Sequence, residues 1–127
     1  MRPIRWTLIV GALTWAAACA SGGATSDNAP RRDRSVITQE EIDASKANDA
    51  YTVVRSLRPA WLLPKTLGSG RQAVQLYVEG SKASGIAALQ EYNVSQIREI
   101  RFFNSEDATT RFGTGNGAGA ILLLLKR

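Results

Sequence analysis

The sequence predicts an α/β domain over residues 36–127, with a small mixed sheet flanked by one long and two short helices. Three observations predict this fold. Apolar residues recur at helical spacing after a capping signal at Thr38, apolar and polar residues alternate in two later segments, and the chain ends in an apolar run. A chain of 127 residues has room for one such domain.

We expect the long helix over residues 38–58. Thr38 can cap the backbone N–H of Glu41, and the Glu41 side chain can reach back to the backbone of Thr38. The α conformation is disfavoured before Pro59, so the helix should end near Arg58. At 100° per residue, one face of this helix collects the apolar residues Ile42, Ala50, Val53 and Leu57.

The middle of the chain predicts a turn, a strand and a short helix. Residues 59–70 combine an apolar turn with glycine and serine, which favours a flexible loop. Residues 73–79 alternate in polarity and predict a half-buried strand that ends in a turn at Gly80. A short helix is expected over residues 86–92. The inward-facing residues of the strand are expected to be Val74, Leu76 and Val78.

The last third of the chain predicts two strands around a short helix. Residues 97–103 alternate and form the first of these strands. Asn104 or Ser105 caps a helix that ends near Phe112. Residues 120–125 are apolar throughout, so we expect a central strand covered on both faces.

The N-terminus has the layout of a secretory signal over residues 1–18. Arg2 and Arg5 precede an uncharged apolar or small stretch from Trp6 to Ala18. A transmembrane helix needs about 20 apolar residues, so we expect a cleaved leader. Cleavage of the leader would remove its two arginines, which contribute to the formal net charge of +5. Most of the evidence for nucleic-acid binding is then lost.

Three alanines end this segment, directly before Cys19, the only cysteine of the chain. Ala16-Ala17-Ala18-Cys19 resembles the lipobox of bacterial lipoproteins, in which the cysteine is acylated and becomes the new N-terminus. The resemblance implies attachment to a membrane through lipid on Cys19. Ala20 follows where an Asp would direct retention at the inner membrane, so it implies the outer membrane. The same alanines also fit an ordinary signal-peptidase site, which would release a soluble periplasmic ligand-binding protein.

Residues 19–35, which begin with this cysteine, are predicted to be a flexible linker. They are rich in Ser, Gly, Asp, Asn and Pro and cannot bury enough apolar surface to order themselves. The whole chain lacks histidine, which excludes imidazole-based catalysis and histidine metal sites.

Candidate partner-binding residues lie in the glycine-rich turn before the last strand: Gly113, Gly115, Asn116, Gly117 and Gly119. A loose dinucleotide-binding pattern runs through this turn to Ala120. That mechanism needs a helix after the turn, and a strand is expected instead. The alternatives are a purely structural turn, whose glycines permit positive φ and close backbone approach, and an exposed recognition loop.

We expect no catalytic residues, no cofactor and no metal site. The acidic pairs at the helix starts are explained by capping and by the helix dipole. A small hydrolase that uses carboxylates is the alternative from another class, and it requires several of them in one cleft. The carboxylates concerned are Glu41, Glu79, Glu99 and Glu106.

Several segments together resemble a known family. Residues 97–103, 107–113 and 117–123 resemble the closing motif of the plug domain of TonB-dependent outer-membrane receptors. Residues 38–57 resemble the helix that opens that domain, and residues 76–80 resemble its strand and turn. The resemblance implies a plug-like fold and an outer-membrane protein as partner. The receptor barrel has no counterpart here, so we expect a non-enzymatic adaptor, ligand-binding or accessory module, not a transporter.

Overall fold

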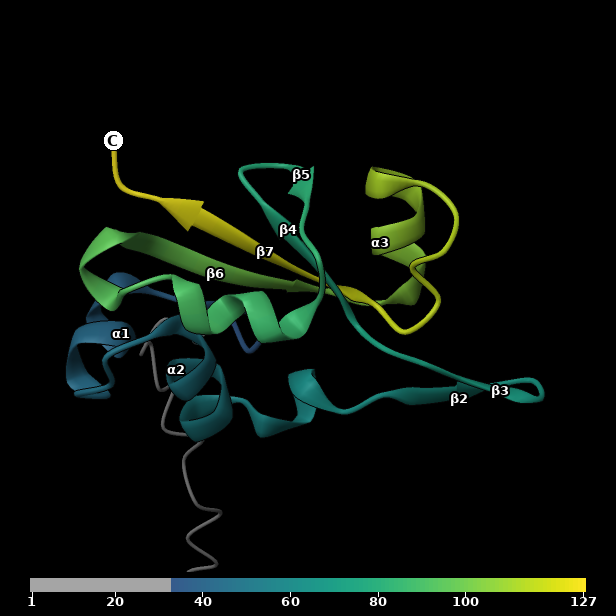
Figure 1. Cartoon of the computed structure of the whole chain (residues 1–127), viewed down its shortest axis with the longest axis horizontal. Helices are drawn as coiled ribbons and strands as arrows, with labels where there is room; N and C mark the ends of the chain where they lie inside the picture. Colours follow the sequence, from purple (N-terminus) through teal and green to yellow (C-terminus); the bar gives the residue numbers. More distant parts are fainter. Residues whose placement is uncertain (1–32) are drawn as a thin grey trace, which may run out of the picture. The chain divides into compact units, whose positions relative to one another are not determined.

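A computed structural model describes residues 33–127 of the chain. The predictions for the leader, for Cys19 and for most of the linker lie outside the described residues. The mixed α/β fold is confirmed (Figure 1). Its main sheet has the strand order β1-β6-β7-β4-β5, and a separate hairpin pairs β2 with β3. The main-sheet strands are β1 (Val36–Ile37), β4 (Gln75–Val78), β5 (Ser81–Lys82), β6 (Ile97–Phe103) and β7 (Ala120–Leu125).

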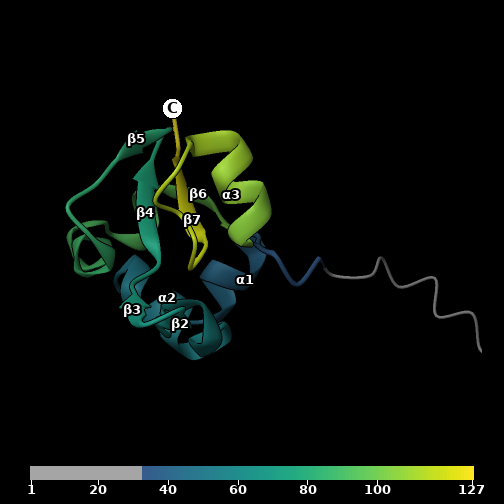
Figure 2. The ribbon, with the colours of Figure 1, turned by 90° about the vertical axis from the view of Figure 1, so that its right-hand side faces the viewer.

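Helices cover both faces of this sheet (Figure 2). One face carries α1 (Gln39–Ala44), α2 (Ala50–Leu57) and the 3₁₀ helices η1 (Pro59–Leu62) and η2 (Ile86–Glu91). The other face carries α3 (Ser105–Phe112). A third 3₁₀ helix, η3 (Val94–Gln96), leads into β6. Within residues 33–127, each helix is too short or too polar to cross a bilayer.

The central position predicted for residues 120–125 is confirmed. β7 pairs with β6 in antiparallel orientation and with β4 in parallel orientation, and the residues from Ala120 to Leu123 are buried. A strand covered on both faces needs apolar side chains on both sides, which explains its uninterrupted apolar run. The short edge strand β1 was not predicted from the sequence. It pairs Val36 with Arg101 and Ile37 with Ile100.

The capping signals are confirmed at both predicted helix starts. Thr38 accepts from the backbone N–H of Glu41 at 3.5 Å, and Glu41 accepts from the Thr38 N–H at 3.2 Å. Asn104 accepts from the Asp107 N–H at 2.8 Å and so begins α3. Both helices therefore begin where the polar side chains satisfy free backbone N–H groups.

The single long helix predicted over residues 38–58 is wrong, because the segment forms α1 and α2. The Ser45 hydroxyl donates to the Ile42 carbonyl at 2.6 Å, and Lys46 adopts a φ of 52°, which ends the first helix. Asp49 then begins α2 by accepting from the Thr52 N–H at 2.8 Å. Asp side chains favour such capping over a helix interior, and this preference outweighs the continuous apolar spacing.

The flexible loop expected in residues 59–70 is in part a β-hairpin. β2 (Lys65–Leu67) and β3 (Gly70–Gln72) pair across a two-residue turn. Gly68 in that turn has a φ of 60°, which glycine adopts without steric cost. The glycine and serine residues that suggested flexibility therefore close a hairpin, and Figure 1 shows this hairpin extending away from the main sheet.

The strand predicted in residues 73–79 is confirmed, but Tyr77 on its outer face is buried. Tyr77 is only 6% exposed, because α3 packs on that side of the sheet. Its ring stacks on Phe112 of α3, with 3.9 Å between the ring centroids. The tyrosine is buried because α3 packs over it. The alternation of polar and apolar residues within one strand does not predict that packing.

Candidate functional site

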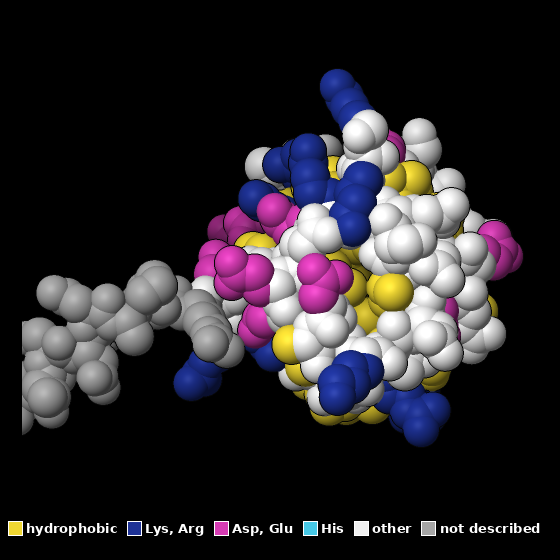
Figure 3. Space-filling view, turned by 90° about the vertical axis from the view of Figure 1, so that its left-hand side faces the viewer, with side chains coloured by type: hydrophobic (Ala, Val, Ile, Leu, Met, Phe, Trp, Pro, Cys, Tyr) yellow, Lys and Arg dark blue, Asp and Glu magenta, His cyan; other side chains and the backbone are white. Residues whose placement is uncertain are grey.

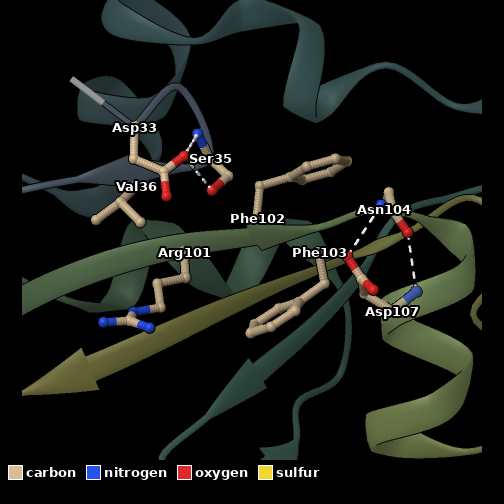
Figure 4. A pocket seen from close by; sticks show the side chains of 8 residues that line it. All are labelled: Asp33, Ser35, Val36, Arg101, Phe102, Phe103, Asn104 and Asp107. Carbon is tan, nitrogen blue, oxygen red and sulfur yellow. Dashed lines mark hydrogen bonds between the residues drawn. The ribbon is translucent and has the colours of Figure 1, made fainter. Parts of the chain in front are cut away.

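A pocket of about 350 Å³ opens where β1 begins, β6 ends and α3 begins (Figure 4). Its walls come from three segments: Asp33 to Val36 at the start of the described chain, Arg101 to Asn104 on β6 and just after it, and Asp107 in α3. Because β1 pairs with the middle of β6, the chain before Val36 lies beside the end of that strand. The pairing of β1 and β6 therefore builds the pocket.

Asp33 is held in a fixed orientation on one wall. Its Oδ1 atom accepts from the Ser35 hydroxyl at 2.6 Å and from the Ser35 backbone N–H at 3.0 Å (Figure 4). The hydroxyl first, and then the backbone N–H, hold the pKa of the Asp33 carboxyl below its usual value. Asp33 is thus a preoriented anion with a second carboxylate oxygen available to accept.

Asn104 and Asp107 form the opposite wall and are bonded to each other. The Asn104 Nδ2 atom donates to Asp107 Oδ2 at 3.0 Å, in addition to the backbone cap at the start of α3. These two side chains are therefore fixed by the helix that they begin. The Asn104 amide and the Asp107 carboxylate therefore line the pocket in fixed orientations.

Arg101 supplies the positive charge. It forms an ion pair with Glu99, and the hydrogen bond that its Nε donates to that carboxylate raises the pKa of the Arg101 guanidinium. The Arg101 side chain stays 48% exposed at the rim of the pocket. A ligand carboxylate or phosphate that approaches this rim would meet a permanent positive charge.

Two aromatic residues add apolar surface. Phe102 and Phe103 point to opposite sides of β6 (Figure 4). Phe102 stacks on Trp61 at 5.4 Å, while Phe103 meets Phe112 edge-on at 5.6 Å. Lys65 lies over the Phe102 ring, 5.6 Å from its centroid, and Arg111 lies over the Phe103 ring at 5.2 Å. Each ring is therefore held by aromatic packing and by a cation.

This arrangement suits binding by hydrogen bonds, charge and aromatic contact. Asp33 is oriented by Ser35, and Asp107 is oriented by Asn104, so both carboxylates serve as fixed acceptors. Across residues 33–127, no three His, Cys, Asp or Glu side chains gather in a way that could hold a metal ion. The walls thus offer fixed carboxylate acceptors on two sides and the Arg101 guanidinium at the rim.

The glycine-rich turn is only partly the exposed loop that was expected. Gly113 and Gly115 are exposed, with φ values of 90° and 94°. Asn116 is 1% exposed, and Gly119 is buried as well, so neither residue can contact a partner directly. Asn116 closes the turn by donating from Nδ2 to the Gly113 carbonyl at 2.9 Å and accepting from Tyr77 at 3.1 Å.

Close packing explains the remaining two glycines. A Cβ atom on Gly119 would lie 2.6 Å from the Phe103 carbonyl oxygen, and φ at Gly119 is 99°. On Gly117 it would lie 2.6 Å from the Leu67 side chain and 2.8 Å from that of Gln72. Positive φ and close approach to backbone are therefore both confirmed at Gly119, whereas at Gly117 the neighbours are the ends of flexible side chains.

The four carboxylates of the hydrolase alternative lie on different elements. Glu41 in α1 pairs with Arg58 at 3.3 Å, and Glu99 in β6 pairs with Arg101. Glu79, in the turn after β4, accepts from the Leu125 backbone N–H. The fourth, Glu106, is exposed in the first turn of α3. The fold does not gather these groups in one cleft.

The pocket was not predicted, because its walls come together only through β1–β6 pairing and the placement of α3. Two local signals do stand in the sequence. Asp33 and Ser35 have the spacing of an Asx turn, and Asn104 and Asp107 have the spacing of a helix cap. Each signal explains one wall, and neither reveals that the walls face each other.

No protein-family model matches this sequence, and no curated protein matches it either. The chemistry of the residues and their positions in the fold therefore carry the functional proposal.

Proposed function

We propose that this chain is an outer-membrane lipoprotein whose folded domain is a non-enzymatic binding or adaptor module of the cell envelope. One observation carries the proposal: the only cysteine, Cys19, directly follows three alanines at the end of an apolar stretch with a basic start. Acylation there would give stable attachment, because about two acyl chains suffice to hold a protein on a bilayer.

The pocket supports a binding role over a catalytic one. Its carboxylates, Asp33 and Asp107, are each tied to a neighbouring polar side chain that fixes their orientation. A carboxyl that acts as the acid in hydrolysis needs a raised pKa, whereas the hydrogen bonds from Ser35 lower the pKa of Asp33. Fixed acceptors with a guanidinium and two aromatic rings instead suit the recognition of a ligand or a protein segment.

The order of elements supports a plug-like interaction module. α3 follows β6, and the turn from Gly113 to Gly119 then leads into the central strand β7. This succession agrees with the resemblance to the plug domain of TonB-dependent receptors. On this reading the domain engages an outer-membrane protein, and its pocket and the exposed part of the turn are the candidate contacts.

Metabolic labelling tests the lipid anchor. Cells expressing the full chain are grown with labelled palmitate, with and without globomycin, which blocks processing of lipoprotein precursors. We expect palmitate on the wild-type chain, accumulation of a precursor under globomycin, and neither effect in Cys19→Ser. An unlabelled, shortened protein in the soluble periplasmic fraction would instead support the secreted ligand-binding alternative. An unmodified full-length chain in spheroplasts would overturn both readings.

Crosslinking in isolated outer membranes tests the partner. Thr114→Trp adds bulk to the exposed part of the turn without changing a glycine, and Thr110→Trp adds the same bulk on the exposed surface of α3. We expect the first variant to reduce recovery of the crosslinked partner and the second to leave it unchanged. Equal recovery with both variants, with the fold intact by circular dichroism, would remove the turn from the interface.

A further inference from the structure

We propose that residues 59–72, named here the basic arm, bind the surface of a bilayer that contains anionic phospholipids. The basic arm consists of η1, the two residues after it, and the β2–β3 hairpin. This would be a second membrane contact, made by the folded domain and separate from acylation of Cys19. It therefore goes beyond the proposed function and does not depend on it.

The basic arm carries the most exposed apolar surface of the domain. Among residues 33–127, Leu63 and Leu67 are the large hydrophobic residues that count as exposed, at 62% and 38%. Pro59, Ala60 and Pro64 beside them are exposed as well. Single exposed leucines are common on protein surfaces, whereas several exposed apolar side chains on one projecting segment indicate a contact surface.

The charges of the basic arm are all positive. Lys65 and Arg71 are exposed, and no acidic residue occurs between Asp49 and Glu79. Neither cation takes part in the ion pairs formed within residues 33–127. Lysine and arginine beside exposed leucine are the side chains that interfacial segments use to bind anionic bilayers.

Acidic residues lie elsewhere on the domain. Figure 3 shows Asp and Glu side chains on the face at the left of Figure 1, where α1 lies, together with Lys and Arg side chains. The hairpin extends from the other end of the domain (Figure 1). The basic arm, which carries no acidic residue, can therefore approach an anionic surface from the end of the domain opposite α1.

The base of the basic arm lies beside the start of the folded domain. Arg58, the residue before the arm, donates from Nε to the Arg34 carbonyl at 3.4 Å. A linker anchored at Cys19 would thus reach the domain next to the arm and raise its local concentration at the bilayer. Only this step rests on the proposed lipid anchor.

A lipid surface fits the basic arm better than a protein partner does. The two-stranded hairpin is exposed along its whole length, and neither Leu63 nor Leu67 lines the pocket described above. Protein recognition at a hot spot uses a pocket around a buried anchor, whereas a fluid membrane interface accommodates exposed apolar and cationic side chains without a shaped pocket. Anionic headgroups also complement an arm with two cations and no acid.

The test places a fluorescent reporter at the tip of the hairpin. The full chain carries Cys19→Ser, which prevents acylation, and Ser69→Cys, labelled with an environment-sensitive nitrobenzoxadiazole group. Vesicles of phosphatidylcholine with phosphatidylglycerol should shift the emission at position 69 to the blue and raise its intensity. Vesicles of phosphatidylcholine alone should not. High salt should reverse the response. The same label at Ser84, after β5, reports a site outside the arm and should not respond.

Charge-reversal variants test whether Lys65 and Arg71 are the side chains that bind the anionic membrane. Lys65→Glu with Arg71→Glu should weaken binding to the anionic vesicles, measured at position 69, by at least about tenfold, since each cation contributes about fivefold. Arg71→Glu alone should weaken it less and leaves the contact of Lys65 with the Phe102 ring intact. The matched control, Lys82→Glu with Arg98→Glu, makes the same change in net charge outside the arm and should alter binding less than about twofold.

Two outcomes would overturn the proposal. One is an equal response at positions 69 and 84, or an equal loss with the control charge variants, in protein that retains its circular dichroism spectrum. The other is a response at position 69 to protein-containing outer-membrane fragments but not to vesicles made from their extracted lipids. That second result would identify a protein partner for the basic arm. Palmitate labelling of Cys19 is unaffected by either outcome, so failure here leaves the lipid anchor to its own test.

Discussion

The hydroxyl of Tyr77 donates a hydrogen bond of 3.1 Å to the side-chain carbonyl of Asn116, and both residues are buried. This bond joins β4 to the turn that leads into β7, the strand parallel to it in the sheet. The Nδ2 atom of the same Asn116 side chain donates to the Gly113 carbonyl. One buried side chain therefore sets the path of the turn that connects α3 with the sheet.

Removing this hydroxyl should destabilise the fold. Tyr77→Phe keeps the ring stacked on Phe112 but leaves the Asn116 oxygen buried without its donor, which costs about 1–3 kcal/mol in the free energy of unfolding. Urea denaturation followed by circular dichroism measures it. Tyr92→Phe is the control, because within residues 33–127 the Tyr92 hydroxyl makes no hydrogen bond. Equal stability of both variants would contradict the role given to this bond.

Three glycines should differ in their response to alanine. At Gly119 a Cβ would strike the Phe103 carbonyl oxygen, and φ is positive, so we expect a loss of about 3 kcal/mol or more. Gly115 has a similar φ in open space, which gives about 1–2 kcal/mol of backbone strain. Gly70 has neither restriction and should change by less than about 0.5 kcal/mol. Denaturation midpoints give the order, and a reversed order would refute the close-approach explanation.

The break between α1 and α2 should depend on Asp49. Asp49→Ala removes the acceptor for the Thr52 N–H and hydroxyl, at 2.8 and 3.0 Å, and should lower stability by about 1 kcal/mol. Asp43→Ala removes an exposed carboxylate from α1 and serves as the matched control. If the two substitutions cost the same, capping by Asp49 does not explain where α2 begins.

The carboxyl of Asp33 should titrate below its usual range. Its hydrogen bonds to Ser35 favour the charged form and lower the pKa in the folded state. A lowered pKa means that this group stabilises the fold fully above its unfolded pKa, and that the contribution is lost as the pH falls through the folded value. NMR titration of the side-chain carbon measures it. Ser35→Ala should raise the pKa, and an unchanged titration would show that Ser35 does not set it.

Local chemistry made several elements predictable. The capping pairs at Thr38 and Asn104 depend on residues three positions apart, so the sequence alone locates both helix starts. The apolar run of β7 is equally local, because a strand covered on both faces has no polar side. The break at Lys46 is not predicted, because the apolar spacing across residues 42–57 fits one helix. In the structure, capping by Asp49 begins a second helix instead.

Most of the candidate site was not predictable in this way. The sequence by itself determined the class of fold and the positions of its main strands, and it contains the single cysteine on which the proposed lipid anchor rests. Only the tertiary structure decided that Tyr77 and Asn116 are buried together, that Asp33 faces Asp107 across one pocket, and that the hairpin projects from the sheet. The physical reason is the distance along the sequence over which each interaction acts. Capping and alternation act between residues a few positions apart, whereas burial and pockets depend on which distant elements the sheet brings into contact.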